Sequence, residues 1–449
     1  MPGKRSKTVS LPIVEADAGG IDIGATQIFV AIPADRDSEP IRCFQTFTVE
    51  LQRLADWLQQ CGIRTVAMES TGVYWIPLFQ ILEQRKIDVR LVNAHHIKNV
   101  PGRKTDVADC QWIQHLHACG LLRGSFRPDD EICAIRSLWR HRDNLIELAT
   151  IHLQHMQKAL DQMNVQLHHV ISDLAGTTGL AIVDAILAGE RDPGKLAELR
   201  DWRIRASKET IMKSLVGDYR EEHIFTLGQS LKCYRHYQDM IEEVDRRVKD
   251  MMQQLPSKVA DGQKPPKEKN PRKTPWRNEP PQLRDDLYRA FGVDLTQVPG
   301  INTLTAQMLL TEVGPDLSRF PTVAAFCSWL RLCPDPKISG GRVLSSRTRP
   351  TKNRAALALR MGAQGLHHSQ SFLGDYFRRI KARMGTPKAM TAAAHKLARI
   401  VYHMVVNRQE YDATVFQKQE QQTLHRKRAK LYAQAKELGF QLVPAPLVP

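Results

Sequence analysis

The chain has 449 residues, which is too long for one hydrophobic core and predicts two or three domains. Lys and Arg number 64 against 48 Asp and Glu, so the formal net charge is +16 and a polyanionic partner is expected. No apolar run is long enough to cross a bilayer and no signal segment follows Met1, which predicts a cytoplasmic protein. The eight cysteines lack regular spacing, which argues against a disulfide framework or a zinc ribbon.

The first 127 residues alternate short strand patterns with helix patterns. Apolar and β-branched runs predict strands over residues 20–24, 27–32, 41–49, 64–69 and 88–93. Amphipathic runs predict helices over residues 51–60 and 74–85, and a third helix after the fifth strand. The predicted order is β-β-β-α-β-α-β-α, which is an α/β fold class.

Four acids occupy special positions in this pattern. Asp22 lies between two isoleucines of the first strand, where a carboxylate is costly unless it is paired or binds a metal. Glu69 ends the fourth strand. Asp106 and Asp109 are three residues apart on the last helix and therefore share one face, although taken alone they fit a solvated helix start better than a metal site. Ligands in such sheets sit near strand ends, so this topology allows all four acids to converge.

A converged set of four carboxylates predicts a metal site. Two divalent cations would neutralise their charge, and a two-metal site about 4 Å across suits phosphodiester chemistry. Hard oxygen ligands favour Mg²⁺ or Mn²⁺ over zinc. Arg103 and Lys104 precede the acid pair, and we expect them to offset its charge and to contact nucleic acid.

From about residue 128 the pattern changes to long helices. Two series of apolar residues follow alternating steps of four and three, as in an a/d seam. The first is Ala149, Leu153, Met156, Leu160, Met163, Leu167 and Val170, and the second is Tyr234, Tyr237, Ile241, Val244, Val248, Met251 and Leu255. The seams can pair with each other as a hairpin or with a second copy of the chain. Residues 256–282 are rich in Pro, Lys and Arg and predict an extended basic linker.

The last region, from about residue 283, combines helices with basic residues. Helices are predicted over 304–313, 323–332 and 355–366, and the Pro-Gly turn at Gly300 resembles a helix-hairpin-helix turn that offers backbone N–H groups to a phosphate. Residues 334–342 contain too much Gly and Pro to predict regular structure, and the basic tail from 417 is expected to fray. The residues expected to contact nucleic acid here are Lys337, Arg342, Arg347, Arg349, Lys352 and Arg354.

Ser339 lies between a lysine-containing loop and two glycines, which leaves its hydroxyl unobstructed, as a nucleophile requires. No histidine is nearby in the sequence to act as a base, so activation would come from a metal or from a residue brought in by folding. From the residues alone, a turn serine is the simpler interpretation.

Several motifs together resemble the insertion sequence 110 family of DNA transposases. Gly-Ile-Asp-Ile-Gly at 20–24, Glu-Ser-Thr-Gly-Val-Tyr-Trp at 69–75 and Arg-Lys-Thr-Asp-Val-Ala-Asp at 103–109 match the family's DEDD tetrad in a RuvC-like (RNase H-like) domain. Residues 185–193 are similar to its middle region. Residues 299–301, 318–321 and 339–341 resemble its carboxyl-terminal transposase domain, and the likeness runs from about 20 to 410.

The resemblance implies a domain order and an activity. It implies a RuvC-like catalytic domain at 1–127, a helical coiled-coil region at 128–255, a linker at 256–282, a mainly α transposase domain at 283–416 and a basic tail at 417–449. The family cleaves and rejoins the donor and target DNA of an insertion sequence through a phosphoserine intermediate. Carried over, that serine is Ser339, acting in a composite site with Asp22, Glu69, Asp106, Asp109 and their Mg²⁺ or Mn²⁺ ions.

The resemblance also implies partners. Family members use a structured guide RNA, or bridge RNA, encoded by the element, which pairs with donor and target DNA. They assemble as homodimers and homotetramers, and they act in the bacterial cytoplasm, associated with the nucleoid.

Two other functions fit the same residues. The first is a RuvC-like, metal-dependent junction nuclease that uses water as the nucleophile and Ser339 only as a turn residue. The second is a non-enzymatic scaffold that binds nucleic acid, for which Asp22→Ala leaves function intact. A covalent protein–DNA intermediate separates the transposase from the nuclease.

Overall fold

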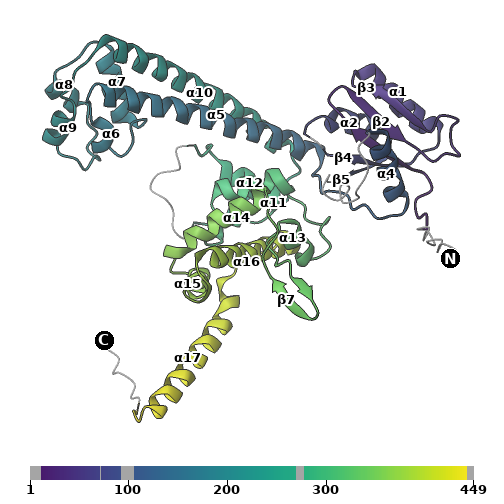
Figure 1. Ribbon diagram of the computed structural model, residues 1–449. Coiled ribbons are helices and arrows are strands. Elements are labelled where there is room, and N and C mark those ends of the chain that lie inside the picture. The colour runs from purple at the N-terminus through teal and green to yellow at the C-terminus, as the bar shows by residue number, and fades with distance from the viewer. Residues whose placement is uncertain (1–11, 71, 93–105, 269–277, 442–449) are drawn as a thin grey trace, which may run out of the picture. The chain divides into compact units, whose positions relative to one another are not determined.

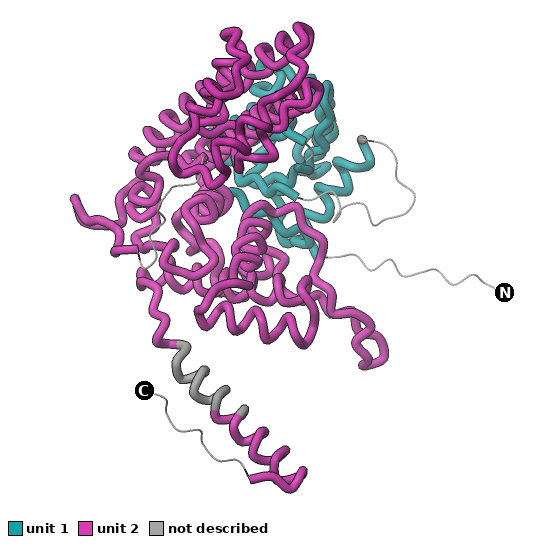
Figure 2. The backbone as a smooth tube through the Cα atoms, turned by 90° about the vertical axis from the view of Figure 1, so that its left-hand side faces the viewer, with its two compact units in different colours: residues 1–127 teal, residues 128–449 magenta. Residues whose placement is uncertain are grey.

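The computed structural model describes residues 12–70, 72–92, 106–268 and 278–441, apart from the side chains of 106, 416–424 and 427. The chain divides into two compact units, Met1–Arg127 and Pro128–Pro449 (Figure 2). Within the described ranges, no helix combines the length and apolar character that a membrane span requires.

The first unit is built on a five-stranded mixed sheet (Figure 1). Its strands are β1 (Ala18–Ile23), β2 (Gln27–Ala31), β3 (Ile41–Gln45), β4 (Thr65–Glu69) and β5 (Asp88–Val92). Their spatial order is β3-β2-β1-β4-β5; β1, β2 and β3 form an antiparallel meander, and β1, β4 and β5 are parallel. The predicted α/β class and the predicted order of elements are confirmed.

Helices cover both faces of this sheet. They are α1 (Thr48–Gln60), α2 (Trp75–Gln84) and α4 (Asp106–Ala118). Successive residues of a strand point to opposite faces, and the core follows that alternation. Ile21 and Met68 pack with the buried residues of α1 and α2, whereas Ala67 packs with Ile113 and Leu116 of α4. The face that carries Ala67 is therefore the α4 face.

The second unit begins with a helical arm, residues 130–254. Its two long helices are α5 (Asp130–Gln162) and α10 (Glu221–Gln254), and four short helices join them: α6 (Leu167–Val170), α7 (Thr177–Leu187), α8 (Pro193–Glu198) and α9 (Lys208–Ser214). The long helices run antiparallel along each other, because Arg142 pairs with Asp245 while His152 stacks on Tyr237 (Figure 1). Of the two arrangements predicted for the seams, the structure shows the first: α5 and α10 pair with each other as a hairpin within the chain.

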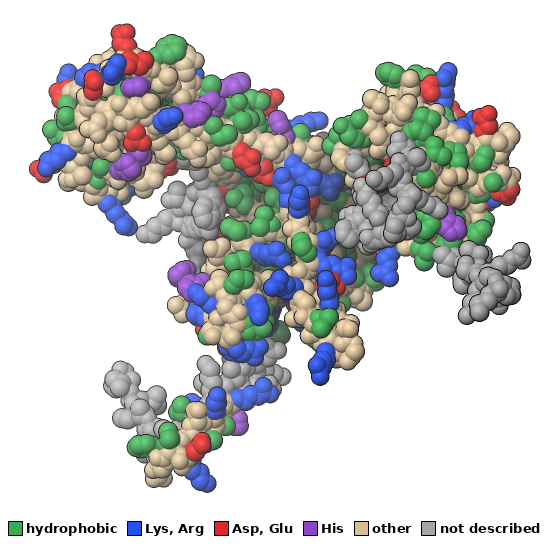
Figure 3. Space-filling view, in the orientation of Figure 1, with side chains coloured by type: hydrophobic (Ala, Val, Ile, Leu, Met, Phe, Trp, Pro, Cys, Tyr) green, Lys and Arg blue, Asp and Glu red, His purple; other side chains and the backbone are tan. Residues whose placement is uncertain are grey.

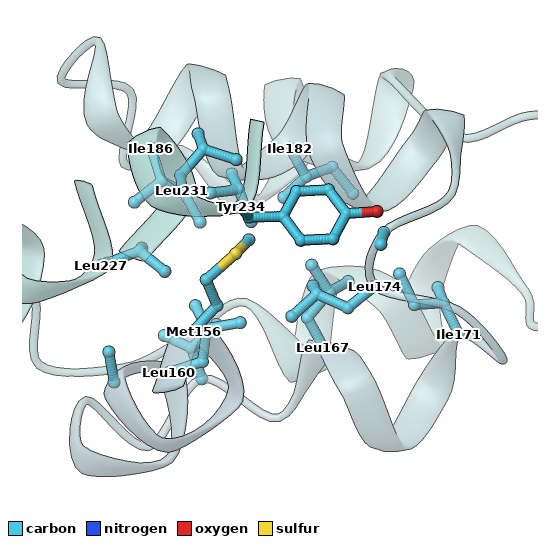
Figure 4. Close-up of a cluster of buried hydrophobic side chains, with 14 of the residues drawn as sticks. Met156, Leu160, Leu167, Ile171, Leu174, Ile182, Ile186, Leu227, Leu231 and Tyr234 are labelled. Carbon is cyan, nitrogen blue, oxygen red and sulfur yellow. The ribbon is translucent and has the colours of Figure 1, made fainter. Parts of the chain in front are cut away.

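The seam in α5 is shorter than predicted. Met163, Leu167 and Val170 lie beyond the end of α5 at Gln162, because the chain turns there into α6. Met163 and Leu167 are still fully buried, in a cluster that closes the end of the arm (Figure 4). The apolar spacing over residues 149–170 thus indicated residues of one continuous core, but not residues of one continuous helix.

The rest of the second unit is a helical body with one small hairpin. Its helices are α11 (Leu283–Phe291), α12 (Thr303–Val313), α13 (Val323–Trp329), α14 (Arg354–Gly365), α15 (Phe372–Met384), α16 (Thr386–Asn407) and α17 (Gln417–Glu437), with 3-10 turns η1 (Leu295–Gln297), η2 (Leu366–His368) and η3 (Ala413–Phe416). The antiparallel strands β6 (Lys337–Ser339) and β7 (Arg342–Ser345) form the hairpin.

Two predictions for this region were wrong. Residues 334–342 are not irregular, because Gly340 and Gly341 form a tight turn between β6 and β7. The basic tail is not frayed over residues 417–437, where it forms α17. Residues 256–268 form no helix or strand, and the backbone of Lys258 is anchored to Arg289 by a 2.9 Å hydrogen bond. The extended linker over residues 256–282 stays a prediction.

Candidate active site

Asp22 and Glu69 lie on neighbouring parallel strands of the first unit. The register pairs Gly20 with Ala67 and Ile21 with Met68, and continuing it by one residue places Asp22 beside Glu69. Alternation along the strands then puts both acids on the face of Ala67, which is the α4 face. Both side chains are half-buried, and both lie at the carboxyl ends of their strands.

Gly20 brings α4 unusually close to this face. A Cβ atom on Gly20 would lie 2.2 Å from the amide nitrogen of Gln114 and 2.4 Å from the carbonyl oxygen of Cys110, both in the backbone of α4. The side-chain amide of Gln114 also donates a 3.2 Å hydrogen bond to the carbonyl of Ala18. Sequence reasoning missed this role of Gly20, although a glycine inside a strand is a known signal of close backbone approach.

The acids of β1 and α4 act on a common neighbour, Cys110. Burial, followed by the negative charges of Asp22 and of Asp109, raises the pKa of the Cys110 thiol to about 12. Two acids that are distant in sequence therefore contribute negative potential at one point. Asp106 is the first residue of α4, but its side chain lies outside the described part of the chain. Arg103 and Lys104 also lie outside the described residues.

The donor set fits a hard divalent cation. Asp22, Glu69 and Asp109 offer only carboxylate oxygens, which suit Mg²⁺ or Mn²⁺ better than Zn²⁺. Asp22 and Asp109 place negative charge beside the buried Cys110 thiol, and a bound cation would offset that charge. These residues could hold such an ion.

Ser339 occupies the end of the hairpin in the second unit. It is the last residue of β6 and pairs with Arg342, the first residue of β7. Gly340 and Gly341 between them have φ values of 55° and 75°, which is the conformation of a type I′ turn and favours glycine at both positions. No atom lies within 4 Å of a Cβ built on either glycine, and the Ser339 side chain is exposed. The hairpin therefore presents this hydroxyl to solvent.

The predicted nucleic-acid contacts around the hairpin fall into two groups. Lys337, Arg342, Arg347 and Lys352 are exposed, and the described part of the chain shows no ion pair for them. Arg349 instead forms a bidentate pair with Asp335 at 2.9 and 3.0 Å, and Arg354 pairs with Asp143 of α5 at 2.8 Å. Figure 3 shows Lys and Arg side chains gathered over this helical body. The first group is open to a phosphate backbone, whereas the second has structural partners.

Gly300 is placed differently from the phosphate-binding turn that its sequence resembles. Its carbonyl oxygen lies 2.2 Å from the position of a Cβ on Gly362, so the turn packs directly on α14. The start of α12 is capped by Asn302, which accepts a hydrogen bond from the Thr305 amide, and the Thr303 hydroxyl donates to Glu279. These protein groups already occupy the beginning of α12, and a phosphate contact at Gly300 stays a prediction.

Comparison with known protein families gives two matches. A model of DEDD transposases of the IS110 type, described as a transposase, matches residues 19–165, which contain Asp22, Glu69, Asp106 and Asp109. A second model, described as the transposase IS116/IS110/IS902 family, matches residues 294–371, which contain Ser339 and the hairpin. Comparison with curated proteins gives no significant match. The chain therefore belongs to the IS110 family of transposases, and it is an enzyme that acts on DNA.

Proposed function

We propose that this transposase cleaves and rejoins the donor and target DNA of an insertion sequence through a covalent link to Ser339. The observation that carries the proposal is the presentation of Ser339 beside a type I′ turn, exposed and flanked by cations that form no ion pair with the described residues. A nucleophile must reach a phosphorus atom in line with the leaving oxygen, and an isolated hairpin end leaves that approach open.

We infer that the first unit is an RNase H-like (RuvC-like) catalytic domain at residues 1–127. Its order, β3-β2-β1-β4-β5 with an antiparallel meander on one side, supports that assignment. Asp22, Glu69, Asp106 and Asp109 would hold Mg²⁺ or Mn²⁺, which supplies Lewis-acid stabilisation of the phosphate when bound. Asp22 and Glu69 provide the fixed part of the site, because both belong to paired strands.

The serine step conserves the phosphodiester energy. The Ser339 oxygen forms a bond to phosphorus, the bond from phosphorus to the leaving deoxyribose oxygen breaks, and the leaving oxygen takes up a proton. The hydroxyl proton of Ser339 passes to a base or to water. Attack of a free DNA hydroxyl on the phosphoserine then reverses these changes, releases the serine and joins a new strand without ATP.

Base pairing by an element-encoded guide RNA would supply the choice of donor and target sequences. The protein would then mainly hold nucleic-acid backbones, which agrees with a formal net charge of +16. We assign Lys337, Arg342, Arg347 and Lys352 to these backbone contacts. Arg103 and Lys104 would serve beside the acids.

The remaining parts of the chain would assemble the complex. We propose that residues 128–255 act as a coiled-coil region through which two or four copies associate. Leu148 and Ile151 of α5 remain 38% and 45% exposed after α5 and α10 have packed together, and they offer apolar surface to a second copy. Residues 283–416 would form the transposase domain that carries the serine, with residues 256–282 as its linker and 417–449 as a basic tail.

A labelled-DNA assay tests the proposal. Purified protein, the element-derived RNA, Mg²⁺ and end-labelled donor and target DNA are incubated, and adducts are resolved on a denaturing gel. We expect a protein–DNA adduct from the wild type, none from Ser339→Ala or Asp109→Asn, and a normal amount from the control Ser346→Ala, which changes an exposed serine after the same hairpin. Cleavage without an adduct that survives in Ser339→Ala would instead establish a water-dependent nuclease.

A further inference from the structure

A group of possible metal ligands lies at the end of the helical arm, away in sequence from the acids of the first unit and from Ser339. Asp161 is in the last turn of α5, and His168 and His169 belong to α6. One ligand atom from each of the three residues lies within 4.8 Å of the other two. Within the described ranges, this is the group of His, Cys, Asp and Glu side chains that meets this geometry.

The distances suit coordination better than hydrogen bonding. The Nε2 atoms of His168 and His169 lie 3.4 and 3.9 Å from the same carboxylate oxygen, Oδ1 of Asp161. A charge-assisted hydrogen bond would be shorter, at about 2.7–2.9 Å. Ligand atoms bound about 2.1 Å from a tetrahedral zinc ion are roughly 3.4 Å apart, which is close to both separations.

The backbone that carries these ligands is held in place by the arm's core. Met163 and Val165 on the connection between α5 and α6, and Leu167 at the start of α6, are all fully buried. Figure 4 shows Leu160 and Leu167 beside Met156 in that core. The amide of Gln166 donates a 2.8 Å hydrogen bond to the carbonyl of Ser214, at the end of α9. The two elements therefore meet in a fixed geometry before any ion binds.

Two features indicate that a cation would stabilise this group. Asp161 lies in the last turn of α5, where the negative end of the helix dipole disfavours a carboxylate. The ring of His168 is 11% exposed, and its Nδ1 is buried without a hydrogen-bond partner in the described protein. Nε2, which faces Asp161, is therefore the ring nitrogen of His168 that is left to bind a partner.

We propose that Asp161, His168 and His169 bind a Zn²⁺ ion that joins α5 to α6 at the end of the arm, with water as the fourth ligand. Two imidazoles and one carboxylate form a borderline donor set that suits Zn²⁺, unlike the all-oxygen set of Asp22, Glu69 and Asp109. The exposure of Asp161 and His169, at 49% and 64%, gives the ion and its water access from solvent.

The chain contains a matched histidine pair that should not bind. His367 and His368 are also adjacent, and their ring centroids are 4.5 Å apart, against 4.1 Å for His168 and His169. However, Nε2 of His367 lies 3.1 Å from the ammonium of Lys381, which repels a second cation. A variant at His368 therefore separates a general effect of losing one histidine from loss of the proposed site.

A zinc competition titration tests the proposal. The untagged full chain is stripped with a chelator and titrated with Zn²⁺ against a chromophoric chelator, with excess Mg²⁺ present to occupy the oxygen-only site. We expect one Zn²⁺ bound by the wild type, by His368→Ala and by Asp22→Asn. His169→Ala, which truncates an exposed ring, and Asp161→Asn, which preserves shape, should bind at least about tenfold more weakly.

Thermal unfolding provides an independent readout. Zn²⁺ should raise the melting temperature of the wild type and of His368→Ala, but not that of His169→Ala. The proposal is overturned if the wild type binds Zn²⁺ no more tightly than His169→Ala, or if His368→Ala loses the same equivalent. Circular dichroism verifies that each variant is folded, and activity on DNA is not needed for either measurement.

Discussion

Gly20→Ala is the sharpest test of how the first unit positions its acids. A methyl group on Gly20 would lie 2.2 Å from the backbone of α4, where ordinary contacts begin at 3.4 Å. Backbone atoms of a packed helix cannot turn aside as a side chain can, so α4 must move by about 1 Å. That movement separates Asp109 on α4 from Asp22, two residues beyond Gly20 on β1.

The expected cost is large in both stability and activity. Overpacking of this kind destabilises by about 2 kcal/mol, which outweighs the few tenths gained when a glycine is removed from the unfolded chain. The melting temperature should fall by roughly 4–10 °C. Mg²⁺-dependent DNA cleavage, measured at 25 °C where circular dichroism shows a folded chain, should fall about 10²-fold because catalytic groups shift by about 1 Å.

Gly19→Ala is the matched control. Gly19 precedes Gly20 on the same strand but faces the opposite side, where the nearest atom to a new Cβ is a side-chain methyl of Val66 at 3.1 Å. A methyl group can shift by a few tenths of an ångström, so this variant should retain cleavage within about threefold. Wild-type cleavage and melting by Gly20→Ala would refute the close approach of α4 to β1.

Three further predictions concern separate parts of the chain. Asp245→Asn leaves the guanidinium of Arg142, which is 1% exposed, without its anion, and should lower the free energy of unfolding by about 3–5 kcal/mol in denaturant titrations, whereas Glu242→Gln should not. Burial is the main cause that lowers the pKa of His117 to about 4. Below pH 6.5 the ring of His117 is protonated in the unfolded chain but not in the folded chain. The free energy of unfolding therefore falls by about 3 kcal/mol as the pH falls from 6.5 toward 4. His117→Leu should reduce that loss in thermal melts measured across this pH range. Gly340→Val forces a β-branched residue to φ 55° at the hairpin turn and should lower adduct yield on DNA with little change in melting temperature, because the hairpin is exposed; equal adduct yield would contradict the role of the turn.

The sequence was most informative where a local pattern and a tertiary role coincide. The strands of the first unit were predicted to within a few residues because their apolar alternation matches burial against α1, α2 and α4. The antiparallel pairing of α5 and α10 was one of two predicted arrangements, since a seam shows that a helix has an apolar partner but not which helix it is.

Sequence patterns gave wrong or incomplete predictions where residue composition alone was used to infer local structure or the availability of a charge. The Gly and Pro content of residues 334–342 predicts irregular structure, whereas two adjacent glycines between Ile338 and Val343 are a hairpin signal. Arg349 and Arg354 could not be distinguished from Arg342 by sequence, because their partners Asp335 and Asp143 are brought near only by folding. A charge run shows how many cations are present, but not how many are already paired.

The most direct test of the central claim is to locate the covalent link to DNA. The adduct formed with Mg²⁺ and guide RNA is digested with nuclease and trypsin, and the phosphorylated peptide is sequenced by mass spectrometry. Cleavage after Lys337 and Arg342 releases Ile-Ser-Gly-Gly-Arg, whose one hydroxyl is that of Ser339. We predict that the nucleotide remnant is on this peptide. A remnant on the following peptide, which carries Ser345 and Ser346, or no remnant from a chain that cleaves DNA, would contradict the assignment of Ser339 as the nucleophile.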